Sequence, residues 1–127
     1  MTAFRIFIIL FALIPLYFGV TGVFLGAAQL MEGMPFTQAM DNQFRYLSGV
    51  YIGISMILFY CAGDVVGRAL LFRGVVLAVF IGGVARAISY LTVGTPPPEQ
   101  VFGMGLELML PLSLLWQARV IRVVTRS

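Results

Sequence analysis

The chain has 127 residues, of which 61% are hydrophobic and only 10% are charged, whereas soluble domains carry about 25% charged residues. This composition excludes an ordinary soluble fold. The net charge of +3 is small and scattered along the chain, so we expect no nucleic-acid partner. Histidine is absent and Cys61 is the single cysteine, which excludes histidine-based metal or haem sites and intrachain disulfides. We therefore predict no cofactor and no metal, and assign no catalytic residue.

Four apolar stretches follow one another along the chain, each close to the roughly 20 residues that a helix needs to cross a bilayer. They are predicted as helices over residues 6–31, 44–62, 74–93 and 102–118. The segments between them contain Gly, Pro or charged residues, as helix ends do. The sequence thus predicts an all-α fold, a four-helix transmembrane bundle, in a single integral membrane domain over residues 1–127.

The first stretch also resembles a secretory signal, because Arg5 precedes it and the small residues "GAA" resemble a cleavage site. Its apolar run is longer than the about 7 to 15 residues of a signal core, which favours a retained membrane helix. Pro15 in the first stretch and Pro111 in the fourth predict kinks.

Most of the arginines fall on one side of the membrane if the chain has four spans. They are Arg5, Arg68, Arg73, Arg119, Arg122 and Arg126. The positive-inside rule then places both termini in the cytoplasm. Residues 119–127 form a basic tail in which arginines alternate with apolar residues, so we expect the fourth helix to continue along anionic headgroups. A docking site for a partner is the alternative.

Small residues recur every four positions in the first three stretches. They are Gly22 and Gly26, then Gly49 and Gly53, then Gly74, Ala78 and Gly82. This spacing lets helix backbones approach closely in lipid. We therefore expect a tightly packed bundle.

Two charged residues, Arg86 and Glu107, lie inside the third and fourth apolar stretches. Counted at about 1.5 Å per residue, both fall in the outer half of the bilayer. An unpaired charge near a helix centre costs roughly 2.5 to 3.5 kcal/mol on insertion scales. The short turn "GTPPPEQ" makes their two helices neighbours, so we predict that Arg86 pairs with Glu107.

Other polar residues are predicted at the same outer level of the bundle, because they follow the start of the second helix or share the face of Arg86. The candidate ligand-binding residues are Asp41, Asn42, Arg45, Ser48, Tyr51, Arg86, Ser89, Tyr90 and Glu107. Each also has a simpler explanation. Asp41 is a candidate N-cap of the second helix as well as a partner of Arg45, and Arg45 fits a side chain that snorkels to the headgroups. Tyr51 and Tyr90 fit interfacial aromatics, and Arg86 with Glu107 fits a purely structural bridge.

Several segments together resemble a known family. "DNQFRYLSGVYIG", "GGVARAISYLTVGTPPP", "LELMLPLSLLWQ" and the opening "FRIFIILFALIPLYFGVTGVFLGA" are similar to bacterial four-helix membrane proteins classed as domain of unknown function 4345. The resemblance implies a topology and carries no activity; with cytoplasmic termini, it implies a multi-pass protein of the bacterial inner (cytoplasmic) membrane. The chain is more distantly similar to DoxX-like four-helix membrane proteins, some of which are subunits of quinone-reducing complexes.

The leading functional hypothesis is a binding or accessory membrane protein rather than an enzyme. Its outer-leaflet pocket takes an amphiphile, a lipid or a quinone, because arginines can hold a phosphate, carboxylate or quinone oxygen by charge-assisted hydrogen bonds.

Three alternatives remain open. One is a structural subunit of a larger membrane complex. Another is an intramembrane enzyme that uses Glu107 or Asp41 as acid or base and Arg86 as electrostatic stabiliser. The third is a proton-coupled transporter that uses Glu107 and needs a homodimer. Expected partners are membrane lipids, then a quinone or other amphiphile, a larger complex or a second copy.

Overall fold

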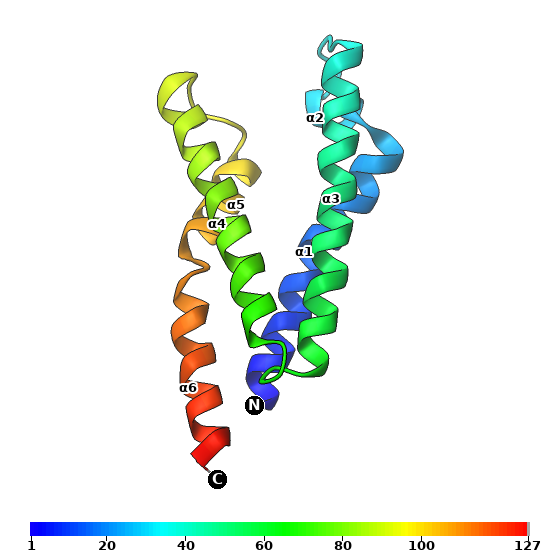
Figure 1. Cartoon of the computed structure of the whole chain (residues 1–127). Coiled ribbons are helices and arrows are strands. Elements are labelled where there is room, and N and C mark those ends of the chain that lie inside the picture. The colour runs from blue at the N-terminus through cyan, green and yellow to red at the C-terminus, as the bar shows by residue number, and fades with distance from the viewer. Residues whose placement is uncertain (127) are drawn as a thin grey trace. The chain divides into compact units, whose positions relative to one another are not determined.

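The computed structural model describes residues 1–126, with all their side chains except those of Gln29 and Arg126. These residues form helices and no strands (Figure 1). The helices are α1 (Thr2–Leu25), α2 (Ala27–Met31), α3 (Gln38–Gly63), α4 (Ala69–Thr92), α5 (Pro98–Met109) and α6 (Leu112–Arg126). The predicted all-α class is confirmed. The end of the predicted basic tail, Ser127 and the side chain of Arg126, lies outside what is described.

Three helices, α1, α3 and α4, are long and apolar enough to cross a membrane. Helices α5 and α6 pass the same test as a pair that is bent by 41°, so the described residues hold three or four candidate spans. Together they indicate a multi-pass membrane protein. The cytoplasmic position of the termini stays a prediction.

Two breaks interrupt the predicted spans, and each has a local cause. The predicted span 6–31 is divided at Gly26, where φ is +68° and ψ is −162°, a backbone region that is essentially restricted to glycine. The fourth span bends at Pro111, which confirms the predicted kink there. Proline has no N–H to offer the Glu107 carbonyl one turn earlier, and the Leu110 N–H donates to that carbonyl instead at 3.4 Å.

The chain divides into two compact units, which are described separately: an N-terminal unit over residues 2–63 and a C-terminal unit over residues 64–126, with which Met1 is grouped. In the N-terminal unit α1 packs along α3. A Cβ added at Gly19 would lie 2.7 Å from the Ser48 carbonyl oxygen, and one at Gly22 would overlap the Ser48 hydroxyl. The α1–α3 contact therefore depends on glycines that leave room for α3.

The predicted small-residue pattern is confirmed in part. Gly22 and Gly26 make close approaches, whereas an added Cβ at Gly49 or Gly53 would meet no atom of the N-terminal unit within 4 Å. In the C-terminal unit Gly83, not the predicted Gly82, faces the neighbouring helix, since its added Cβ would lie 2.8 Å from Cβ of Glu107. The approach of α4 to α5 thus occurs directly beside a charged residue.

Helices α4 and α6 are joined by the buried side chain of Gln117. Its amide nitrogen donates to the Ala69 carbonyl at 3.2 Å, and its oxygen accepts from Nε of Arg73 at 3.1 Å. A satisfied amide at this position stabilises the contact, because a buried polar group without partners would be unfavourable. The sequence alone predicted no role for Gln117.

Replacing Gln117 by leucine is expected to lower the free energy of unfolding by about 1 to 2 kcal/mol, because both hydrogen bonds are lost. Ser113 on the same helix is the matched control. Its buried hydroxyl has no hydrogen-bond partner among the described residues, so Ser113→Ala is expected to be neutral or stabilising. Denaturation of both variants in detergent micelles, followed by circular dichroism, measures the difference. Equal losses would contradict the assignment.

Candidate functional site

Asp41 and Arg45, both on α3, form hydrogen bonds to backbone groups on either side of the break between α1 and α2. Oδ2 of Asp41 accepts from Nε of Arg45 at 2.9 Å, and its Oδ1 accepts from the backbone N–H of Ala27 at 2.9 Å. Nη1 of Arg45 donates to the Val23 carbonyl at 2.6 Å. Helix ends leave backbone groups without hydrogen-bond partners. This pair supplies partners to a carbonyl at the end of α1 and to an N–H at the start of α2. We call Asp41, Arg45, Val23 and Ala27 the α1–α2 latch.

The predicted pairing of Asp41 with Arg45 is confirmed, whereas the alternative that Asp41 caps α3 is wrong. The hydroxyl of Thr37 accepts from the Met40 N–H at 3.1 Å and so caps the helix, which begins at Gln38. The sequence carried a signal for this cap, since threonine before a helical segment is a common N-cap. Asp41 lies one helical turn beyond the cap position.

The other candidates of the N-terminal unit are placed as follows. Ser48 is buried against Gly22, and its hydroxyl donates to the Phe44 carbonyl at 2.8 Å. Tyr51 is half-buried and Asn42 is exposed. Ser48 therefore serves the packing of α1 on α3.

In the C-terminal unit Arg86 of α4 and Glu107 of α5 form the predicted ion pair. Nε of Arg86 lies 3.5 Å from Oε2 of Glu107, and the two side chains are 36% and 17% exposed. The pairing is confirmed, but it is loose, since charge-assisted hydrogen bonds between these groups measure about 2.7 to 2.9 Å. Oε2 of Glu107 is buried and has no hydrogen-bond partner among the described residues. Its ionic contact with Arg86 is therefore not backed by a short hydrogen bond.

A small cavity of about 50 Å³ lies beside Arg86. Its lining consists of Arg86, Ser89, Pro96, Gln100 and Met104. Ser89 shares the Arg86 face as predicted, while Tyr90 is absent from the lining and is 36% exposed. The cavity thus combines a guanidinium, a hydroxyl and an amide with two apolar side chains. We call it the Arg86 cavity.

Apart from Glu107, the α5 residues that complete this region were not predicted from the sequence. Gln100, Gly103, Met104 and Glu107 follow the spacing i, i+3, i+4 and i+7, which places them on one helix face. An added Cβ at Gly103 would lie 3.3 Å from Nη1 of Arg86. Tracing this period back from Glu107 would have found them.

The nine predicted site residues are therefore divided between the units. Asp41 and Arg45 meet in the N-terminal unit, while Arg86, Ser89 and Glu107 lie close together in the C-terminal unit. Their convergence on one pocket stays a prediction. Within the described residues no three Asp, Glu or Cys side chains gather as metal ligands would.

Comparison with known proteins adds a family. A family model described as a domain of unknown function, DUF4345, matches residues 3–117. The chain belongs to the DUF4345 family. Both the latch and the Arg86 cavity lie within the matched part, and Arg119 and the residues after it lie beyond it. No curated protein and no solved structure matches this DUF4345 chain, and the expected similarity to DoxX-like proteins is not shown.

Proposed function

We propose that this protein is a binding or accessory membrane protein, and that the Arg86 cavity holds the polar head of a lipid or quinone. The observation that supports it is the ion pair itself. Arg86 is 36% exposed and lines the cavity. A guanidinium embedded in a membrane needs polar partners, and the head group of a ligand in the cavity is such a partner. Oε2 of Glu107 approaches this guanidinium at Nε, 3.5 Å away.

The chemistry of the lining suits an oxygen-rich head group. Guanidinium offers five N–H donors in a planar fork and suits phosphate or carboxylate oxygens. Ser89 and Gln100 add a hydroxyl and an amide, which can donate to a carbonyl oxygen or accept from a hydroxyl. A phosphate ester, a carboxylate and a quinone carbonyl share this acceptor chemistry.

The cavity is large enough for the head of such a ligand but not for its tail. The cavity volume of about 50 Å³ exceeds the roughly 10 to 15 Å³ that a cavity needs to hold one water, so the cavity has room for a few atoms of a head group. Exposed apolar side chains of the same unit, Leu91, Val93 and Phe102, offer a surface for the tail. An amphiphile fits this division better than a compact polar solute.

Amphiphile retention tests the proposal. The wild-type protein, extracted in mild detergent, is expected to retain a lipid or quinone that mass spectrometry identifies. Ser89→Leu fills the cavity and leaves the ion pair intact, so it is expected to reduce retention at least about tenfold, the ratio for a 1.4 kcal/mol loss. Arg86→Met combined with Glu107→Gln removes both charges together and is expected to have the same effect.

Arg5→Gln serves as the control, because it removes an exposed arginine of the N-terminal unit. Circular dichroism and gel filtration verify that each variant is folded. Retention of the same amphiphile by the control and both cavity variants in equal amounts would contradict the proposal. If the cavity variants lose a bound lipid but keep a bound quinone, the lipid is the ligand of the cavity.

A further inference from the structure

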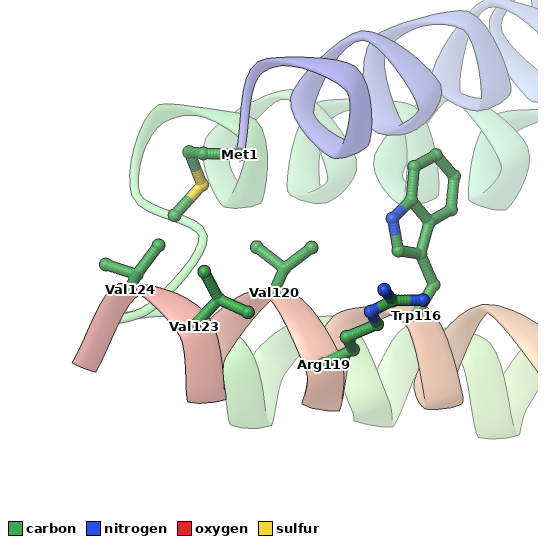
Figure 2. Close-up of a pocket in the computed structure, with 6 residues that line it drawn as sticks. All are labelled: Met1, Trp116, Arg119, Val120, Val123 and Val124. Atoms are coloured by element: carbon green, nitrogen blue, oxygen red, sulfur yellow. The ribbon is translucent and has the colours of Figure 1, made fainter. Parts of the chain in front are cut away.

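Helix α6 carries a groove near its end, separate from the Arg86 cavity. The groove measures about 210 Å³ and is lined by Met1, Trp116, Arg119, Val120, Val123 and Val124 (Figure 2). Figure 2 shows the three valines along one side of α6, with Trp116 and Arg119 further toward its start. The lining is thus largely apolar, with one guanidinium beside it.

Charge along this helix has one sign only. Between Leu112 and Arg126 the sequence contains arginines and no acid. Arg119 and Arg122 are exposed, and neither forms an ion pair with any residue that the structure describes. Arginines at the end of a membrane helix place their guanidinium groups at headgroup level. An anionic partner at that level would complement them.

We propose that this groove binds an anionic phospholipid, with its phosphate on Arg119 and an acyl chain along Trp116, Val120 and Val123. Apolar side chains next to an unpaired guanidinium match the two parts of such a lipid. The charge favours an anionic lipid over a zwitterionic one, because each basic residue near an anionic membrane surface contributes a factor of about five in binding. The groove shares no lining residue with the Arg86 cavity, so this inference is separate from the function proposed above.

Trp116 makes the test direct, since it is the single tryptophan of the chain and lines the groove. The full-length protein is reconstituted in phosphatidylcholine bilayers that contain increasing fractions of brominated phosphatidylglycerol or of brominated phosphatidylcholine. Bromine quenches tryptophan fluorescence on contact. We expect half-maximal quenching at a roughly fivefold lower fraction of the brominated phosphatidylglycerol, and a weaker preference at high salt because of screening.

Substitutions test which residues cause the preference for phosphatidylglycerol. Arg119→Gln is expected to remove it, Arg119→Lys to retain most of it, and Arg5→Gln to leave it unchanged although it removes the same charge. Val123→Ser changes an exposed residue, so it tests the apolar wall in a protein that still folds, and it is expected to reduce quenching by both lipids. Equal quenching of the wild type by the two lipids would overturn the proposal. So would equal effects of Arg119→Gln and Arg5→Gln, since attraction would then follow net charge alone.

Discussion

Gly26→Ala is expected to lower the free energy of unfolding by roughly 2 to 5 kcal/mol. Two effects add at this position. Alanine is strained at φ +68° and ψ −162°, and its Cβ would overlap Oδ1 of Asp41 and lie 2.6 Å from Nη2 of Arg45. The α1–α2 latch would have to open to relieve the overlap. Denaturant titration in detergent micelles, followed by circular dichroism, measures the loss.

Gly33→Ala separates strain from crowding. Gly33 also has a positive φ, +85°, but an added Cβ there would meet no described atom within 4 Å. Its replacement is therefore expected to cost only the backbone strain, about 1 kcal/mol. If the two substitutions destabilise the protein equally, the contacts of the latch contribute nothing and the account of the helix break is wrong.

The second large effect is expected at Arg86 and Glu107. Arg86→Met leaves Glu107, which is only 17% exposed, without its cation, and should destabilise the protein by roughly 2.5 to 3.5 kcal/mol. Glu107→Leu leaves the more exposed Arg86, which can turn toward the headgroups, so its effect should be smaller. The double variant should be more stable than Arg86→Met alone, since no uncompensated charge remains.

A double-mutant cycle measures this coupling directly. The four proteins are compared by the same denaturant titration, with Arg5→Gln as a control for loss of an arginine far from α5 in sequence. Additive losses in the double variant would show that the two charges do not interact, despite their separation of 3.5 Å.

The two arginines of the predicted site, Arg45 and Arg86, play different parts. Nε of Arg45 donates to Asp41 at 2.9 Å, and its Nη1 donates to the Val23 carbonyl at 2.6 Å, which joins α3 to α1 in the N-terminal unit. Arg86 has a longer contact with its acid and borders a cavity. Of the two, Arg86 is therefore the arginine to which we assign the proposed ligand.

The features that the sequence predicted correctly are those with a strong local energetic cause. Arg86 and Glu107 fall in adjacent apolar stretches, where unpaired charges are unfavourable, and this requirement predicted their pairing. Pro111 predicted the bend for a similarly local reason, the missing N–H. Helix existence followed from apolar length, so the all-α class was also accessible.

Features that depend on tertiary partners were not accessible in this way. Gly26 lies in an unbroken apolar run, and the residues that fasten its break, Asp41 and Arg45, come from α3. The choice of Gly83 over Gly82 as the contact with α5 depends on the rotation of α4 about its axis. Spacing alone does not determine that rotation: the four-residue repeat of Gly74, Ala78 and Gly82 predicts Gly82 at the contact, and the structure places Gly83 there.

Side-chain nitrogen NMR of arginine tests the central claim, that Arg86 binds an amphiphile head, most directly. All basic residues of the chain are arginines, eight in number, so selective labelling gives few Nε signals, and Arg86→Lys assigns the one of interest. On titration with a short-chain lipid or quinone into detergent-solubilised protein, the Arg86 signal should shift saturably, while that of Arg45, held in the latch, stays in place. An Arg86 signal that remains unchanged with every amphiphile tested, or that moves only together with all the others, would contradict the account.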